Sequence, residues 1–310
     1  MGFGFDSTTD DVLAGVDLRG RIAIVTGASA GLGTETARAL AAAGATVTMT
    51  GRDPDKLARA AEKVRSAVPG ADITTSPLDL ASLESVRTFA QEWLAANDRL
   101  HLLVNNAGVM FAPYGHTVDG FETHFGTNHL GHFLLTNLLV PALLADPPAR
   151  IVNLSSGGHV ASGIIWDDPN YERRPFDKME AYGQSKTANI LFSLELDRRL
   201  ATRGVHAYSV HPGMIVTTDL GRTMTREDYQ QMKERAKANP SGGGLPPTKT
   251  VEQGAATTVW AATAPELDAH GGAYLADCAI AEPAPWARDP QDAARLWTLS
   301  EQLVGQEFRY

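Results

Sequence analysis

The chain has 310 residues, of which 43% are hydrophobic and 20% charged, and its formal net charge is −9 at pH 7. This length allows one or two domains, and the composition is that of a globular chain with a sizeable core. The acidic balance, with no lysine- or arginine-rich run, argues against nucleic acid or an anionic membrane surface as a partner. A single cysteine, Cys278, predicts a reducing, cytoplasmic location. We expect no secretory signal and no membrane span, because the longest apolar stretch, residues 133–145, is too short.

Short apolar runs alternate with helical patterns along most of the chain. Residues 1–20 are polar and then mixed, and they predict a short arm lying on the core. Strands are predicted at residues 22–26, 45–50, 72–78, 100–104, 150–154 and 205–210, and the first of them is expected to be buried because it is apolar and β-branched. Helices are predicted at residues 34–43, 53–68, 83–96, 119–145 and 179–201. This alternation predicts an α/β fold with one doubly wound parallel sheet and helices on both faces.

The organisation predicts one catalytic domain. No composition break divides residues 21–280, and residues 281–310 are expected to form a helical extension packed on the same domain. Two segments interrupt the regular pattern: residues 157–177, rich in Gly, Asp and Pro, and residues 219–250, where a polar helix precedes a Gly/Pro-rich loop at 240–247. Both follow the carboxyl ends of strands, where ligands bind in such sheets, so we expect both to be substrate loops.

A glycine-rich turn joins the first strand to the first helix in the pattern Thr-Gly-x-x-x-Gly-x-Gly. Glycines let the backbone approach a pyrophosphate, and the helix N-terminus supplies N–H groups and a positive dipole. The alternative is a tight turn without a ligand, but the position between a strand and a helix favours dinucleotide binding. The predicted contacts here are Gly27, Ser29, Ala30, Gly31, Leu32 and Gly33.

The end of the second strand indicates which cofactor is bound. An acidic residue there would bind a ribose 2′-hydroxyl, whereas an arginine would accept a 2′-phosphate. The chain has Arg52 at this place, with Gly51 before it, so NADP(H) is preferred over NAD(H). Asp53 is interpreted as a helix N-cap. After the third strand, Asp79 and Leu80 are placed to contact the adenine, and Asp79 is also compatible with capping the next helix.

Polar and small residues recur where the later strands end. Adjacent amides and small residues at 105–108 permit close approach of the backbone to a flat ligand, although a simple turn is the alternative. Asn128 lies inside a predicted helix, where asparagine is mildly unfavourable. Ser155 and Ser156 end the fifth strand. The further predicted cofactor contacts are Asn106, Ala107, Gly108, Pro212, Gly213 and Thr217.

Tyr182 and Lys186 begin a predicted helix in the sequence Tyr-Gly-Gln-Ser-Lys. Residues four apart share a helix face, so the phenol and the ammonium are neighbours. A phenol with a pKa of about 10 is a poor acid or base at neutral pH. A nearby ammonium lowers that pKa toward the range of efficient proton transfer. Such a pair also occurs by chance in surface helices, so the neighbouring motifs decide the interpretation.

Together these motifs resemble the short-chain dehydrogenase/reductase family over residues 20–280. The amino-acid sequence of several stretches, such as NHLGHFLL and RIVNLSS, is similar to that of the retinol dehydrogenase and WW-domain oxidoreductase branch. The resemblance implies a fold of the Rossmann type and interconversion of a carbonyl and an alcohol with NADP(H), or with NAD(H). It implies that Tyr182 exchanges a proton with the substrate oxygen and that Lys186 lowers the tyrosine pKa and holds the nicotinamide ribose, so that both also contact the cofactor. It further implies that Ser156 binds the substrate oxygen and that Asn128 positions a water.

The substrate is expected to be a small carbonyl or alcohol compound. The predicted pocket residues are Ser156, His159 and Met214, with the loop 157–177 as a wall. No apolar anchor precedes the first strand, unlike in membrane-bound retinol enzymes, so a retinoid is not expected. No metal site is predicted. The resemblance also implies a homodimer or homotetramer formed through the helices at 119–145 and 179–201.

Two other functions are compatible with parts of the pattern. One is a catalytically idle nucleotide-binding or scaffold member of the family, against which the intact Asn128, Ser156, Tyr182 and Lys186 argue. The other is an epimerase or dehydratase of the extended branch, which shares the glycine-rich turn and the Tyr/Lys pair. Residues 105–108 and the absence of a large C-terminal substrate domain disfavour it.

Overall fold

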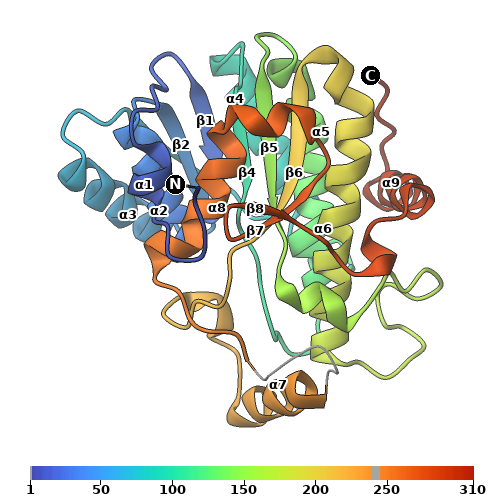
Figure 1. Cartoon of the computed structure of the whole chain (residues 1–310). Coiled ribbons are helices and arrows are strands. Elements are labelled where there is room, and N and C mark those ends of the chain that lie inside the picture. The colour runs from blue at the N-terminus through green and yellow to red at the C-terminus, as the bar shows by residue number, and fades with distance from the viewer. Residues whose placement is uncertain (1, 239–244) are drawn as a thin grey trace.

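One sheet organises the molecule. The computed structural model describes residues 2–238 and 245–310, so residues 240–244 of the predicted Gly/Pro-rich loop lie outside the described residues. The eight strands run in the order β3-β2-β1-β4-β5-β6-β7-β8, and all neighbours are parallel except β7 and β8 (Figure 1). The strands are β1 (Ile22–Val25), β2 (Thr46–Gly51), β3 (Ile73–Pro77), β4 (Leu102–Asn105), β5 (Ala149–Leu154), β6 (Val205–His211), β7 (Tyr274–Ala276) and β8 (Ala279–Ala281). The predicted α/β class with a doubly wound sheet is confirmed.

Helices cover both faces of this sheet (Figure 1). They are α1 (Thr9–Leu13), α2 (Gly31–Ala42), α3 (Pro54–Ala67), α4 (Leu83–Ala96), α5 (Gly131–Leu143), α6 (Lys178–Leu200), α7 (Arg226–Ala238), α8 (Val251–Thr263) and α9 (Pro290–Val304). Side chains of α1, α2, α3 and α8 form one apolar core with Val25 and Val47, and those of α4, α5, α6 and α9 form another with Ile24 and Leu103. Neighbouring residues of β1 enter opposite cores because side chains alternate along a strand.

The predicted elements are found with shifted ends, and one prediction is wrong in part. The expected single helix at 119–145 is a π-helix at Phe125–Leu130 followed by α5, while residues 117–121 form a turn closed by the hydrogen bond from Thr117 N to Phe121 O. The sequence pattern did not reveal this change of helical pitch. Single-turn π-helices occur frequently at functional sites, and this one carries Asn128.

The C-terminal residues complete the core on one side. Trp297 of α9 is 2% exposed and contacts the rings of Phe133 on α5 and Phe192 on α6. Arg199 of α6 stacks its guanidinium on the same indole, 4.1 Å from the ring centroid. Phe308, beyond α9, also packs on Phe133. The chain's own C-terminal segment therefore covers apolar surface of α5 and α6.

Within the described ranges, no helix is both long and apolar enough to cross a membrane.

Candidate active site

The glycine-rich turn forms a tight cradle between β1 and α2. Gly27 and Gly31 have positive φ angles of 64° and 55°, which glycine adopts without strain. A Cβ atom added at Gly33 would lie 2.5 Å from the carbonyl oxygen of Gly27, so only glycine lets α2 approach β1 this closely. Ala30, the residue before α2, has no side chain that could cap the helix. The first N–H groups of α2 are thus left for an anion, which fits the pyrophosphate of a dinucleotide.

The end of β2 lies beside this cradle. A Cβ atom added at Gly51 would be 3.6 Å from the Ser29 hydroxyl oxygen, so the turn and the strand end meet here. Arg52 follows with an exposed side chain, and among the described residues no carboxylate forms an ion pair with it. Asp53 caps α3 by accepting a hydrogen bond from the N–H of Lys56, as predicted. Arg52 is therefore available to a phosphate next to Ser29.

The helix after β3 is capped by a residue other than the predicted one. Ser82, rather than Asp79, is the N-cap of α4. The carboxylate of Asp79 instead accepts the N–H of Ala81, which fixes the turn after β3. Leu80 is buried, and its carbonyl oxygen would collide with any side chain at Gly131, at the point where the π-helix passes into α5. Asp79 and Leu80 thus shape the strand end, and their contact with adenine stays a prediction.

A buried hydrogen-bond chain joins the end of β4 to the glycine-rich turn. The Asn106 amide donates to the carbonyl oxygen of Thr26 at 2.7 Å. The N–H of Ala107 donates to the Thr26 hydroxyl at 3.0 Å, and this hydroxyl lies 2.9 Å from Nε2 of His132. A Cβ atom added at Gly27 would sit 2.8 Å from Cα of Ala107, so the two loops touch directly. The residues predicted from the motifs at 26–33 and 106–108 are therefore in one place.

His132 extends this chain to Asn128. Its Nδ1 lies 3.0 Å from the carbonyl oxygen of Asn128, which can only accept, so the proton is on Nδ1 and Nε2 accepts from Thr26. Burial lowers the pKa of His132 to about 4, so the ring is neutral at neutral pH. His132 is not among the predicted site residues. Its position four residues after Asn128 was the available signal, since such residues are neighbours on a helix.

Asn128 connects the loop after β4 to α6. Its amide Nδ2 donates to the carbonyl oxygen of Val109 at 3.0 Å and to the Ser185 hydroxyl at 2.9 Å, and its Oδ1 accepts from the N–H of Val109 at 2.8 Å. A Cβ atom added at Gly108 would be 3.3 Å from this Oδ1 and 3.5 Å from Nζ of Lys186. The structure thus brings Asn128, Gly108 and Lys186 together.

Tyr182 and Lys186 lie on the same face of α6, both buried, with exposed fractions of 5% and 3%. The Lys186 ammonium lies 5.7 Å from the centroid of the Tyr182 ring and donates to the carbonyl oxygen of Leu154, the last residue of β5, at 2.9 Å. Ser155 Oγ donates to the carbonyl oxygen of Lys186. These contacts fix α6 against the carboxyl end of β5, at the edge of the sheet where ligands bind.

The pKa of Tyr182 shifts in the direction opposite to the predicted one. Burial raises the pKa of Tyr182 to about 12, and the hydrogen bond with Ser156 acts in the opposite sense without reversing it. Burial also lowers the pKa of Lys186 to about 7. A neighbouring ammonium alone would lower the tyrosine pKa. Desolvation instead disfavours the charged form of both Tyr182 and Lys186. In the protein alone, Tyr182 is therefore a protonated phenol at neutral pH, and Lys186 is the group that titrates there.

Ser156 is the N-cap of a short 3-10 turn, Gly157–Ala161, and is hydrogen-bonded to Tyr182. Its hydroxyl accepts the N–H of Gly158 at 3.0 Å, and a Cβ atom added at Gly158 would be 2.9 Å from the Tyr182 ring. The predicted pocket residue His159 is buried, and both of its ring nitrogens bond to backbone atoms, Ser156 O and Ala284 N. In this structure His159 therefore has no free ring nitrogen for a substrate.

Lys249 packs against the loop after β6 and fixes it. The aliphatic part of the Lys249 side chain would lie 2.8 Å from a Cβ atom at Gly213, whose φ is 88°, and its buried ammonium pairs with Asp277 at 2.5 Å. Thr218, rather than the exposed Thr217, packs over Gly31, within 3.1 Å of a Cβ atom there. The order of residues in a loop does not reveal which threonine faces inward.

The other two predicted residues of this loop are less informative. Pro212 and Met214 are half-buried, and Met214 pairs with Thr248 through the backbone. Their contacts with a ligand stay predictions.

Aromatic side chains gather on one side of Tyr182. Phe111 lies 6.5 Å and His124 6.2 Å from Tyr182, measured between ring centroids. The inserted loop 157–177 contributes Phe176, which stacks on His124 at 6.4 Å. His124 is held by the buried carboxylate of Glu122 at 2.7 Å and accepts the N–H of Ala112. The loop 157–177 thus contributes to an aromatic environment beside Tyr182, and its contact with a substrate stays a prediction.

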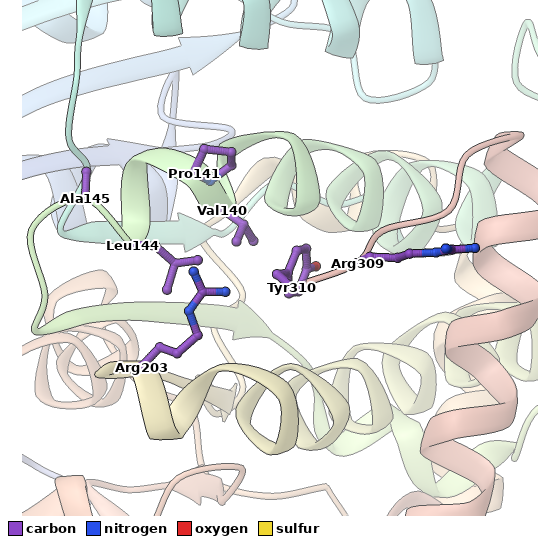
Figure 2. A pocket seen from close by; sticks show the side chains of 7 residues that line it. All are labelled: Val140, Pro141, Leu144, Ala145, Arg203, Arg309 and Tyr310. Atoms are coloured by element: carbon purple, nitrogen blue, oxygen red, sulfur yellow. The ribbon is translucent and has the colours of Figure 1, made fainter.

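A separate hollow of about 350 Å³ lies away from these residues (Figure 2). It is formed by the end of α5, the turn after α6 and the last two residues of the chain. None of the predicted site residues contributes to it, so it is not the candidate site. Its lining consists of Val140, Pro141, Leu144, Ala145, Arg203, Arg309 and Tyr310.

The cradle, the strand-end loops and the Tyr/Lys helix together define a dinucleotide-binding enzyme site. The family model for short chain dehydrogenases matches residues 21–229, and the chain belongs to this family. It is an NAD(P)-dependent oxidoreductase that interconverts a carbonyl and an alcohol.

Known relatives cover nearly the whole chain. Retinol dehydrogenase 12 of Mus musculus is 42% identical over 293 residues, which cover 94% of this chain and 89% of the relative. WW domain-containing oxidoreductase of Danio rerio is 39% identical over 301 residues, 95% of this chain and 71% of the relative. The solved structure of the Pseudomonas aeruginosa RhlG/NADP active-site complex is 29% identical, with a TM-score of 0.63 over 84% of this chain and 95% of that chain. The predicted family and its branch are confirmed.

Proposed function

We propose that the enzyme prefers NADP(H) over NAD(H) and that Asn128, Ser156, Tyr182 and Lys186 manage the proton that accompanies the reaction. The observation that carries the proposal is the convergence of Tyr182, Lys186 and Ser156 at the carboxyl end of β5, next to the glycine cradle. The cofactor, when bound, supplies or accepts the hydride.

Tyr182 is the proton donor to the substrate oxygen when a carbonyl is reduced. Its raised pKa keeps the phenol protonated at neutral pH, and the protonated phenol is the form that a carbonyl requires. Ser156 is hydrogen-bonded to Tyr182 and, in the proposed mechanism, donates a hydrogen bond to the substrate oxygen. Both groups are polar tips in an apolar, aromatic environment, where hydrogen bonds to a developing oxyanion are strengthened.

Lys186 replaces the proton that Tyr182 gives to the substrate, and its charge affects the pKa of Tyr182. Its pKa of about 7 lets the ammonium lose and regain a proton near neutral pH. Asn128 braces the loop at Val109 against Ser185 and keeps Lys186 beside Gly108. In the proposed mechanism, a protonated Lys186 favours the tyrosinate that remains after proton transfer.

The preference for NADP(H) rests on Arg52 and Ser29. A guanidinium and a hydroxyl at the end of β2 are the donors that a ribose 2′-phosphate requires, and no acidic residue stands at Gly51 to repel it. Arg52→Ala should weaken NADPH binding about tenfold, since one exposed charge-assisted hydrogen bond contributes about 1.4 kcal/mol. NADH binding should stay within twofold of the wild type. Fluorescence titration with both nucleotides measures this, and equal losses for the two would refute the assignment.

The proton chemistry is tested with Tyr182→Phe. This variant should lose more than about 99% of turnover with NADPH and 4-nitrobenzaldehyde, because the proton donor is removed. Its affinity for NADPH should change less than threefold, since the ring and its packing are kept. Wild-type turnover in this variant would refute the role of Tyr182, whereas lost NADPH binding would indicate a folding defect.

We also propose a cellular location and a constraint on the assembly of the protein. A cytoplasmic location is consistent with the single, unpaired Cys278. Association through α5 and α6, as the family resemblance implies, is restricted because α9 already packs on these helices through Trp297. We infer that a homodimer using this face would leave α9 in place and contact its outer side.

A further inference from the structure

The position of the Ser156 hydroxyl depends on the turn that carries it. The hydroxyl accepts the N–H of Gly158, two residues along the chain, and Gly158 lies directly on the Tyr182 ring. The N–H of Gly157 donates to Nδ1 of His211, at the end of β6. Any displacement of this turn would therefore move the serine relative to the phenol.

His159 links the turn to a distant part of the chain. Its Nδ1 lies 2.7 Å from the carbonyl oxygen of Ser156, and its Nε2 lies 3.0 Å from the backbone nitrogen of Ala284. A carbonyl can only accept and an amide can only donate, so the ring carries its proton on Nδ1 and is neutral. The ring is 3% exposed and packs on Tyr274 of β7, 5.1 Å between centroids.

The carbonyl oxygen of His159 has a further link to residues 284–286. It accepts from the indole Nε1 of Trp286 at 3.3 Å. The Thr187 hydroxyl, next to Lys186 in α6, lies 3.2 Å from the same oxygen and has a closer acceptor in Ser162 O at 2.7 Å. Two residues of the segment 284–286 therefore bond to His159, one to its ring and one to its backbone. This segment lies outside residues 21–229, which the family model matches.

We propose that His159 is a positioning residue, which fixes the Ser156 turn by bridging Ser156 to the segment 284–286. It does not touch the reacting atoms, and it acts through the Ser156 carbonyl and the geometry of the turn. The proposal rests on the catalytic role of Ser156 given above. It replaces the expectation that His159 contacts the substrate, because both ring nitrogens already bond to backbone atoms.

Two substitutions of His159 separate its two contacts. The amide nitrogen of an asparagine lies near the position of Nδ1, so His159→Asn keeps the donor to Ser156 and loses the contact with Ala284. The amide oxygen of a glutamine lies near the position of Nε2, so His159→Gln keeps the acceptor for Ala284 and loses the side-chain hydrogen bond to Ser156 O, which keeps the backbone N–H of residue 159 at 3.1 Å. If the ring only fills space, the two variants should have similar kcat values.

The expected result is a difference in kcat between these variants. With NADPH and 4-nitrobenzaldehyde, His159→Gln should lose at least about tenfold in kcat, because small misplacements of catalytic groups are costly. His159→Asn should lose less, about threefold to tenfold, because it keeps the hydrogen bond to Ser156 and breaks only the link to Ala284, while the NADPH affinity of both variants should stay within about threefold of the wild type. Equal kcat values for His159→Gln and the wild type would overturn the proposal. Ser156→Ala tests the role of the serine separately, since wild-type kcat in that variant would refute the proposed function instead.

A third variant tests the link to the distant segment. Ala284 has a φ of −56°, which proline adopts, so Ala284→Pro removes the N–H donor without straining this residue. It should lower kcat in the wild-type background and have no further effect on His159→Asn, which has already lost this contact. Additive losses would overturn the link. Nitrogen NMR of the His159 ring gives a readout independent of turnover: we expect a protonated Nδ1 and an unprotonated Nε2, and the opposite tautomer would refute the bridge.

Discussion

Lowering the pH should destabilise the folded protein through His132, at pH values above those at which most aspartates and glutamates titrate. The ring is buried, and its pKa is about 4 in the folded protein, against about 6.5 for a free histidine. The folded state therefore binds fewer protons than the unfolded chain, and stability falls as the pH drops from 6.5 toward 4. Between pH 7 and pH 5 the loss from this one group is about 2 kcal/mol. Aspartates and glutamates contribute little in this window, because they titrate mainly below it.

The variant His132→Gln isolates this contribution. Glutamine can still accept from the Thr26 hydroxyl but does not titrate, so the variant should be less stable at pH 7 and lose less stability on acidification. Urea unfolding at pH 7 and pH 5 should show a pH-dependent loss about 2 kcal/mol smaller than in the wild type. His270→Gln, at an exposed histidine, is the control for removing an imidazole. Equal losses in wild type and His132→Gln would show that the buried ring does not resist protonation.

Three further substitutions test separate parts of the structure. Gly33→Ala should weaken NADPH binding at least about tenfold in a titration, because its Cβ would lie 2.5 Å from Gly27 O and α2 must move away. Trp297→Ala should lower the free energy of unfolding by about 3–5 kcal/mol in urea, since the indole is 2% exposed; a loss below about 1 kcal/mol would mean that α9 contributes little to the core. Glu122→Gln should cost about 1–3 kcal/mol, because the buried carboxylate accepts the backbone N–H of His124 and of Phe125, and unchanged thermal stability would contradict this.

The central sheet and the cofactor turn could be predicted because short-range patterns determine them. Most of the parallel strands carry apolar runs, while β3 buries only Ile73, and the turn at 27–33 is defined by glycines whose φ angles and close contacts exclude other residues. The last two strands, β7 and β8, have three residues each, too few for a period to emerge. The hairpin between them turns through Asp277 and Cys278, both with positive φ, where the sequence has no glycine to mark the turn.

The site was predictable in its residue types more than in its contacts. Tyr182, Lys186, Ser156 and Asn128 were identified from motifs, and the structure brings them together at one end of the sheet. The effect of burial on the tyrosine pKa could not be read from spacing, because spacing does not reveal solvent exclusion. Likewise, His159 lies three residues from Ser156, but only the fold reveals that the segment at 284 occupies its second nitrogen.

The packing of α9 also sets the order in which the chain can finish folding. The aromatic surface of α5 and α6 is synthesised well before Trp297 and Phe308, which cover it. During translation this surface is therefore exposed until the last part of the domain has left the ribosome, and exposed apolar surface on an intermediate promotes aggregation.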